Sequence, residues 1–402
     1  MKLGVPSACC SSCCTSSSFG GKPLRLRLNS HKNNTTNFTC RANLITDSES
    51  FQVGKLIATY GFMNITSFSG SPSALDNELR LRVQDVGQGN VNIRLYGGRV
   101  IQGPLRGTPV IFKVYPGQQL GGSESDMMAA NELNAHTFLQ SSSRTRCQNI
   151  QVLLGGFETK MGEQWLAFRD HGKYSAADYA KLKSQKLSQD QNFWNPFEKE
   201  QLIKRRRFYV VKLLHGAISG LSYMHDHDRL HQSLGPASVV VNTTAEKEAA
   251  YLIPRLRDLA FSVDIRYSRL GERPSTLSEG LWRRASAAGA DSPMEKRAFG
   301  IADDIYEAGL LFAYLAFIPF CEAGIMDSLS LQRLLESTFR LDIQAARDYC
   351  LVDDRFLEAV KFLDLGGGAG WELLQAMLNP DFRKRPIAEA VVNHRFMTGA
   401  VL

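Results

Sequence analysis

The chain has 402 residues, of which 44% are hydrophobic and 22% are charged. These values exclude wholesale disorder and allow a two-lobed globular domain or two small ones. The formal net charge is +7, but five of the 47 basic residues precede position 41, and no acidic residue precedes Asp47. The remaining 42 basic residues nearly balance the 40 acidic ones. The positive charge therefore belongs largely to the first segment, and we expect no nucleic-acid partner.

The first 40 residues are rich in Ser and Cys and contain no acidic residue. This composition is typical of an organelle transit peptide, and the lack of a continuous apolar run disfavours a secretory signal. The basic residues do not form the Arg-spaced amphipathic helix of a mitochondrial presequence, and segment 38–42 resembles a plastid processing site near Cys40. We predict a plastid transit peptide over residues 1–40 and a location in the chloroplast stroma. A disordered Ser-rich tail is the alternative.

The rest of the chain contains only three cysteines, Cys147, Cys321 and Cys350, which are widely spaced. This spacing predicts neither a structural zinc site nor a disulfide framework. The longest apolar run covers residues 308–321. A membrane-spanning helix needs about 20 apolar residues, so we predict no transmembrane span and interpret this run as the buried centre of a soluble domain.

Residues 41–80 are polar and rich in Ser and Gly, and we interpret them as a linker or an N-terminal extension, although some stretches favour β-structure. From residue 81 the pattern becomes strand-like. The predicted strands are 81–83, 93–96, 110–115, 152–154 and 165–168, and the predicted helix is 123–140. Strands interrupted by one helix predict a small α+β lobe over residues 81–170.

After residue 170 the pattern is mostly helical, which predicts a larger helical lobe over residues 171–398. The predicted elements are a helix over 174–186, a polar insertion over 187–200, an amphipathic helix over 208–225, a hairpin of 239–241 with 251–253, and a helical remainder with a break at Gly366-Gly367-Gly368. The basic run 204–207 is typical of a solvated helix start, and a docking patch for an acidic partner is the alternative.

Lys113 lies in an apolar strand, and Glu132 follows 19 residues later in the predicted helix. A strand lysine that binds phosphates is oriented by a carboxylate, which a following helix can supply. Upstream, Gly87 and Gly89 form a Gly-x-Gly, which lets the backbone approach phosphates closely. Each signal is weak alone, since the lysine could lie at a sheet edge and the glycines in an ordinary β-turn.

Several segments in a fixed order carry a more specific signal. Besides the Gly-x-Gly and the lysine–glutamate pair, they are Leu230–Val240 (LHQSLGPASVV), Arg257–Ala260 (RDLA), Ala302–Gly309 (ADDIYEAG), and Leu378–Pro386 (LNPDFRKRP) followed by His394-Arg395-Phe396. In order and character they resemble the motifs of the protein kinase superfamily. The resemblance spans about residues 85–397, nearly all of the expected mature chain.

This resemblance implies an α+β, two-lobed protein-kinase-like fold with a small β-rich lobe and a larger helical lobe. It also implies a site for ATP with Mg²⁺. Gly87, Gly89, Lys113 and Glu132 match the nucleotide-binding positions of the family, and Asp258 matches the metal-binding acid.

The resemblance gives three further residues an architectural role. His231, Asp304 and Arg385 match positions that fix the catalytic loop and the helical lobe in the family. In the family the arginine pairs with the Glu of an A-P-E motif. The nearest match here is 292–295, at shortened spacing, so Arg385 is free to have another partner.

The catalytic loop departs from the family where phosphate would be transferred. Ser233 stands at the position of the catalytic Asp, Ser238 at that of the metal-binding Asn, and Gly235 at that of a Lys. A serine hydroxyl has no base character near neutral pH, and glycine carries no charge to offset that of a moving phosphate. No intact catalytic residue is therefore expected in this loop.

Two functions are compatible with a sequence that matches the family at some site positions and departs from it at others. The first is a catalytically impaired pseudokinase of the plastid that acts as an ATP-binding regulator or scaffold for a protein partner. The second is an active Ser/Thr-type protein kinase that transfers the γ-phosphate of ATP to a protein substrate through an unconventional catalytic loop. Ser233 and Ser238 favour the first function, while Lys113, Glu132 and Asp258 keep the second open. The sequence does not indicate the oligomeric state.

Overall fold

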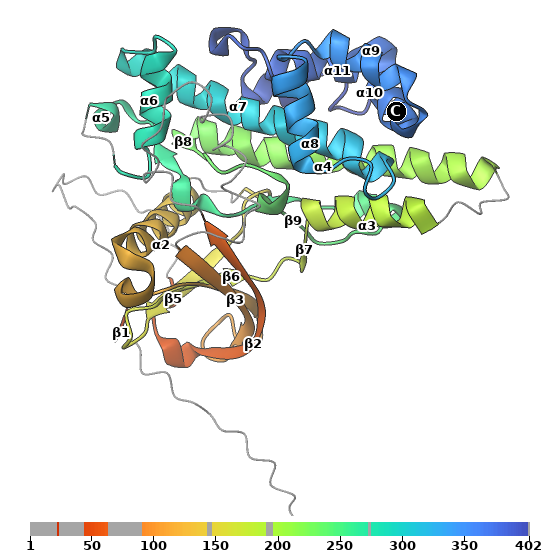
Figure 1. The fold of residues 1–402 in the computed structure, drawn as a ribbon. Coiled ribbons are helices and arrows are strands. Elements are labelled where there is room, and N and C mark those ends of the chain that lie inside the picture. The colour runs from red at the N-terminus through yellow and green to blue at the C-terminus, as the bar shows by residue number, and fades with distance from the viewer. Residues whose placement is uncertain are drawn as a thin grey trace, which may run out of the picture.

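The structure is a computed structural model, and it describes residues 22–23, 44–62, 91–142, 147–189, 196–271 and 275–400. Figure 1 shows one lobe built around a β-sheet and a larger lobe built from helices. This arrangement confirms the predicted α+β, two-lobed architecture. The predicted leader lies outside the described residues, apart from Lys22–Pro23.

The smaller lobe contains a six-stranded antiparallel sheet with the order β1-β5-β6-β4-β3-β2. The strands are β1 (Lys22–Pro23), β2 (Phe51–Phe62), β3 (Val91–Val100), β4 (Pro109–Tyr115), β5 (Leu153–Glu158) and β6 (Gln164–Arg169). Side chains alternate between two buried faces, as the strand geometry requires. One face holds an aromatic cluster around Phe112 and Trp165, and the other packs on helix α2 through Leu166 and Phe168.

The first long strand corrects our interpretation of residues 41–80 as a linker or extension. Residues 51–62 form β2, which pairs with β3 from Phe51↔Val100 to Phe62↔Val91. The sheet therefore begins well before residue 81. The predicted strand 81–83 lies outside the described residues. The other domain boundaries stay predictions.

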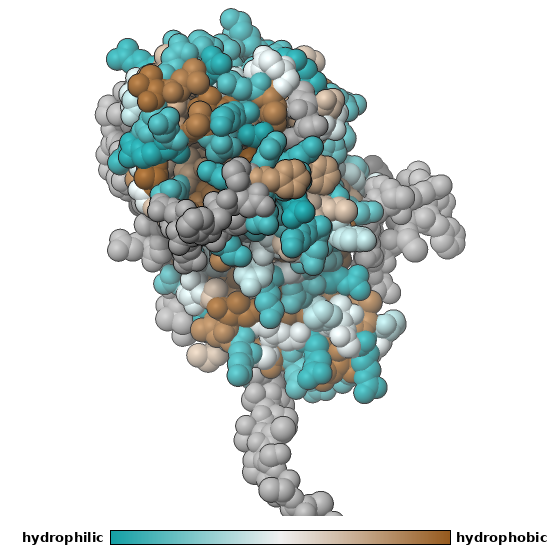
Figure 2. All heavy atoms as spheres, turned by 90° about the vertical axis from the view of Figure 1, so that its right-hand side faces the viewer, coloured by the Kyte–Doolittle hydropathy of each residue, from teal (hydrophilic) through white to brown (hydrophobic). Residues whose placement is uncertain are grey.

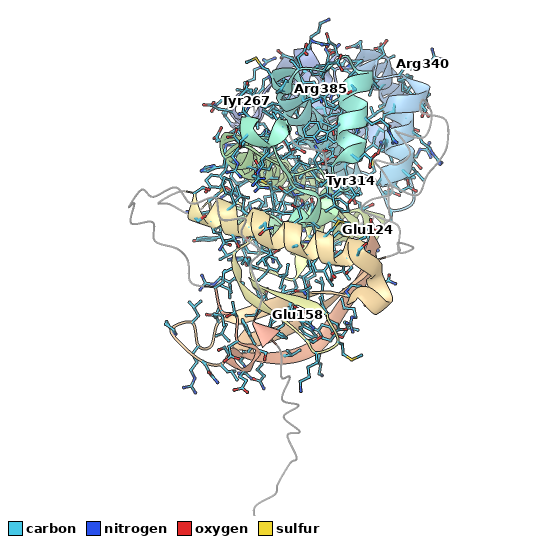
Figure 3. The ribbon with its side chains drawn as sticks, turned by 90° about the vertical axis from the view of Figure 1, so that its left-hand side faces the viewer. Glu124, Glu158, Tyr267, Tyr314, Arg340 and Arg385 are labelled. Carbon is cyan, nitrogen blue, oxygen red and sulfur yellow. The ribbon has the colours of Figure 1, made fainter. Side chains whose placement is uncertain are left out.

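Helix α2 (Gln118–Ser141) contains the predicted helix 123–140 and packs one side against the sheet. Its first residues are set apart by a left-handed Gly122 (φ 64°). Asn131 Nδ2 donates to the carbonyl oxygens of Ala260 (2.7 Å) and Ser262 (2.8 Å), which belong to the helical lobe. Figures 1 and 3 both show α2 along the side of the sheet that meets this lobe. This helix therefore joins the two lobes.

The larger lobe is built around helix α7. Its elements are β7 (Tyr174–Ser175), α3 (Ala176–Gln189), α4 (Pro196–Asp226), β8 (Arg229–Leu230), η3 (Pro236–Ser238), β9 (Val239–Val241), η4 (Glu246–Tyr251), β10 (Arg255–Leu256), η5 (Leu259–Phe261), β11 (Val263–Asp264), α5 (Tyr267–Leu270), α6 (Glu279–Ala287), α7 (Pro293–Phe317), η6 (Ile318–Phe320), α8 (Ser328–Arg333), η7 (Leu334–Thr338), α9 (Ile343–Val352), η8 (Asp354–Phe356), α10 (Leu357–Leu363), α11 (Leu365–Met377), η9 (Phe382–Lys384) and α12 (Ala388–Val392).

Helix α7 starts sharply and is then buried. Ser292 accepts from the amide of Glu295 in a capping box, and Pro293 fits the first helical position, where no amide donor is needed. Most residues of 299–317 are buried, so the apolar run 308–321 forms core, as expected. Within the described part of the chain, none of the helices is apolar over a length that would cross a membrane. Figure 2 shows apolar residues on the helical lobe in separate patches among hydrophilic ones.

Three local expectations for the helical lobe need correction. The polar segment 187–200 is not wholly an insertion, since α3 ends at Gln189 and α4 begins at Pro196. The hairpin partner of β9 is β10 at 255–256, not 251–253, because residues 246–251 form the 3-10 helix η4. The predicted break at 366–368 is confirmed, since all three glycines have positive φ inside α11.

The basic run 204–207 lies within α4 and is only partly a solvated helix surface. Arg206 is 2% exposed, and it donates to Glu246 Oε1 (3.0 Å) and to the carbonyl oxygen of Pro319 (2.7 Å). Arg207 lies 3.4 Å from a carboxylate oxygen of Glu358. Two of the four charges are therefore used inside the lobe, which leaves little of the run for an acidic partner.

Replacing Arg206 by Ala should lower the free energy of unfolding by about 3 kcal/mol, because the nearly buried carboxylate of Glu246 loses its closest cation. The matched control is the exposed Arg205→Ala, which should change it by less than about 0.5 kcal/mol. Urea unfolding of both variants measures the difference. Equal effects of the two substitutions would show that the run is solvated throughout.

Candidate functional site

The centre of the candidate site is the buried lysine of strand β4. Lys113 lies inside the sheet, opposite Leu95 on β3 and Leu166 on β6, and is only 3% exposed. Its Nζ lies 2.7 Å from Glu132 Oε2 and 2.7 Å from Asp258 Oδ1. Burial alone would lower the pKa of Lys113, but the carboxylates of Asp258 and Glu132 raise it well above its usual value. The lysine is therefore a permanent cation. Glu132 meets it as the spacing indicated, and Asp258 meets it as the resemblance implied.

Glu132 is fixed on α2 by neighbours on both sides. The hydroxyl of Tyr115, two residues after Lys113 on the same face of β4, donates to Glu132 Oε2. His136, one helical turn further, has its Nε2 3.9 Å from Glu132 Oε1. Burial and the nearby charge of Lys113 lower the pKa of His136 to about 3. The histidine is therefore neutral at physiological pH and adds no charge to the site.

Asp258 comes from the segment between β10 and η5. Its backbone is left-handed (φ 66°), a conformation that Asp tolerates better than most residues. Burial alone would raise the pKa of Asp258, but the charges of Lys113 and Arg257 and hydrogen bonds from Lys113 and Tyr60 lower it to about 2. The acid is therefore an ionised carboxylate that the sequence correctly placed beside Lys113.

Two residues of the site were not predicted. The hydroxyl of Tyr60 on β2 donates to Asp258 Oδ1 (3.0 Å), and its ring centroid lies 5.9 Å from Lys113 Nζ. Arg257 Nε lies 3.2 Å from Asp258 Oδ2. The β-prone stretch 51–62 was the available signal for Tyr60, but we assigned it to a linker. Arg257 belongs to the recognised segment 257–260, but the sequence did not indicate that it forms an ion pair with Asp258.

The two serines of the loop are engaged in local hydrogen bonds. Ser233 Oγ donates to the carbonyl oxygen of Asp258 (2.8 Å) and lies 3.4 Å from His231 Nδ1. Ser238 Oγ donates to the carbonyl oxygen of Gly235 (2.9 Å) and accepts from the amide of Gly235 (2.9 Å). Both side chains are buried. They act as structural hydroxyls that bond to the backbone.

Asp304 organises the backbone of this loop from the centre of α7. It is completely buried, and its Oδ2 accepts from the amide of His231 (2.8 Å) and lies 2.9 Å from His225 Nε2. Its Oδ1 accepts from both the amide (2.9 Å) and the side chain (3.0 Å) of Gln232. His231 Nε2 in turn lies 3.1 Å from the carbonyl oxygen of Arg257. These contacts agree with the architectural roles implied for Asp304 and His231.

Arg385 packs against the middle of α7, and the contacts described join it to backbone carbonyl oxygens and an aromatic ring. It donates to the carbonyl oxygens of Asn379 (2.7 Å) and Ala302 (3.0 Å), and its guanidinium lies 4.6 Å from the ring centroid of Tyr306. Figure 3 labels it in the helical lobe. Glu295, the nearest match to the family's A-P-E glutamate, caps α7 and lies 3.8 Å from Arg383.

The predicted phosphate loop lies outside the residues that the structure describes. Gly87 and Gly89 fall in residues 63–90, outside the described residues, so their role stays a prediction. These residues connect β2 to β3. The side chains that the structure brings together are Lys113, Glu132 and Asp258, with the addition of Tyr60 and Arg257.

Comparison with known proteins supports the fold. No protein-family model matches the sequence, and no curated protein matches it. Among solved structures, the chain is similar to a Stt7 homolog from Micromonas algae, in a crystal soaked with ATP, with a TM-score of 0.54 and 15% identity. The match covers 93% of this chain and 98% of that one. The chain therefore has the two-lobed protein-kinase-like fold.

The low pKa of Asp258 predicts how the stability of the protein depends on pH. A depressed carboxyl pKa stabilises the folded state above the unfolded value of about 3.9, and this contribution fades as the pH falls towards about 2. Asp258→Asn should therefore cost about 3–5 kcal/mol between pH 5 and 8, and less at pH 3.5.

Urea unfolding of both proteins at pH 7, 5 and 3.5 measures this cost. The exposed Asp226→Asn is the control, with an expected change below about 0.5 kcal/mol. A cost for Asp258→Asn that stays constant down to pH 3.5 would contradict a depressed pKa.

Proposed function

We propose that this chain is a plastid pseudokinase, a protein-kinase-fold protein that binds ATP and regulates or scaffolds a protein partner without transferring phosphate. One observation carries the proposal. The cation of Lys113 is held between Glu132 and Asp258, while the transfer positions hold Ser233 and Ser238, whose hydroxyls bond to backbone. The residues that would bind a nucleotide are therefore present, and serines stand at the positions that would transfer its phosphate.

The lysine supports ATP as the ligand. In the kinase fold, a lysine at this place on the third long strand of the sheet contacts the phosphates, and a glutamate from the following helix orients it. Lys113 and Glu132 have this arrangement, with their charged atoms 2.7 Å apart. The Stt7 homolog of similar fold was studied in a crystal soaked with ATP, which agrees with the proposal.

The serines oppose phosphate transfer. Transfer requires a hydroxyl aligned with the γ-phosphate and groups that offset the charge spread over that phosphate. Ser233 has neither the charge nor the basicity of the carboxylate it replaces, and Gly235 offers no cation. The loss of one such group typically slows a reaction by orders of magnitude.

An active kinase with an unconventional loop is the second candidate. The observation that favours it is the intact Lys113–Glu132 pair, because this ion pair must be in place in active kinases. Transfer of phosphate from ATP to a protein distinguishes the two candidates, since both would bind ATP.

The first experiment measures ATP binding and phosphate transfer on the same preparations. ATP should raise the melting temperature of the wild type, because a ligand that binds only the folded state stabilises it. Lys113→Met should abolish this rise, since the phosphates lose their cation. Exposed Lys160→Met is the control and should leave the rise unchanged. Incorporation of radiolabelled phosphate should be no greater in the wild type than in Lys113→Met.

Lys113→Met could fail to fold, because Glu132 and Asp258 would be left buried without their shared cation. The double variant Lys113→Met/Glu132→Gln removes one charge of each sign and provides a second test of binding. Robust phosphate incorporation by the wild type that disappears in both variants would establish the active kinase instead. No change of melting temperature with ATP in the wild type would refute ATP binding.

The plastid location is supported by the acid-free, Ser-rich composition of residues 1–40. A fluorescent reporter fused after residue 40 should enter chloroplasts, and imaging in plant cells measures its location. The same reporter without residues 1–40 is the control and should stay outside them. Delivery to mitochondria or to the secretory pathway would refute the prediction.

A further inference from the structure

The carboxylate that matches the family's metal ligand is already surrounded by donors. Asp258 Oδ1 accepts from Lys113 Nζ (2.7 Å) and from the hydroxyl of Tyr60 (3.0 Å). Its Oδ2 lies 3.2 Å from Arg257 Nε. A divalent cation at this carboxylate would share it with these donors, two of which are positively charged.

The second metal position of the family is equally engaged. Ser238 uses its hydroxyl both to donate to the Gly235 carbonyl and to accept from the Gly235 amide. In the ranges that the structure describes, no three His, Cys, Asp or Glu side chains come together as a possible metal site. Mg²⁺ at a nucleotide site is held by one or two carboxylates together with phosphates, and here the matching carboxylate of Asp258 already accepts from Lys113 and Tyr60.

The charges of the cluster are also balanced without a metal. Glu132 and Asp258 supply two negative charges, and Lys113 and Arg257 supply two positive ones. A dication added to this neutral set would lie close to two fixed cations at low exposure to water, where repulsion between like charges is strong. An anionic ligand would find a partly accessible cation here, since Arg257 keeps 24% of its side chain exposed beside the site.

We propose that this site binds ATP without a divalent cation, with Lys113 and Arg257 offsetting the charge of the phosphates and Tyr60 occupying the carboxylate of Asp258. The inference rests on the proposed ATP binding and replaces the expected role of Asp258 as a Mg²⁺ ligand.

Calorimetric titration of the full chain with ATP, in EDTA and in excess Mg²⁺, tests the inference. The dissociation constant in EDTA should be equal to or lower than that in Mg²⁺. Tightening by Mg²⁺ of about fivefold or more, the lower end of usual couplings between two ligands, would overturn it. Binding that occurs only in Mg²⁺ would also overturn it while leaving the proposed ATP binding intact.

Two variants test the residues themselves. Tyr60→Phe/Arg257→Gln removes a hydrogen bond and a cation from Asp258, which opens the carboxylate. This variant should bind ATP more weakly than the wild type in EDTA and should be tightened by Mg²⁺ by about fivefold or more. An affinity that responds to Mg²⁺ in the same way in the variant and the wild type would refute the roles of Tyr60 and Arg257.

A measurement without nucleotide keeps the inference testable if ATP does not bind in either buffer. Titration with Mn²⁺ alone, followed by water proton relaxation, reports a bound metal directly. The wild type and Asp258→Asn should give the same result. Mn²⁺ binding that is lost in Asp258→Asn but kept in the control Asp226→Asn would show that Asp258 is a metal ligand.

Discussion

The structure depends on one buried cation, the ammonium of Lys113. A charge that is almost completely removed from water is tolerated only when carboxylates compensate it at short range. Glu132 comes from α2 and Asp258 from the segment before η5, so the two compensating groups belong to different lobes. Tyr60 on β2 adds a hydrogen bond to Asp258. The ion pairs of Lys113 therefore help to fix the position of the sheet relative to the helical lobe.

The loop beside this cation is held in shape by Asp304 and by the hydroxyls of Ser233 and Ser238. Asp304 accepts from the backbone amides of His231 and Gln232, and these bonds form whatever residue follows. Ser233 and Ser238 then bond to nearby carbonyl oxygens, so that each of these two buried hydroxyls has a partner. The backbone of this loop is thus held by buried hydrogen bonds, with serine hydroxyls at positions 233 and 238.

Sequence reasoning found the residues that lie in ordered motifs and missed those that depend on distant pairing. Lys113 and Glu132 were found from their spacing along strand and helix, and Asp304 from the resemblance of segment 302–309 to a protein kinase motif. Tyr60 was missed because its strand pairs with β3 across a long connection, with Tyr60 opposite Ile93, and local β-propensity did not indicate that partner. The predicted strand 251–253 was also wrong, and η4 ends at its first residue. Glu246 of η4 accepts from Arg206 of α4, a tertiary contact that local sequence preference does not reveal.

The same cation that joins the lobes is the one proposed to meet the phosphates, and this double role has a consequence. Lys113 shares its three donor hydrogens among Glu132, Asp258 and any anionic ligand. A ligand that draws the ammonium towards itself weakens or redirects a contact between the lobes, so its affinity must depend on their relative position. By linkage, the arrangement of the lobes must depend equally on the ligand. Under the proposed function, filling the site would therefore change the surface that the two lobes present to a partner.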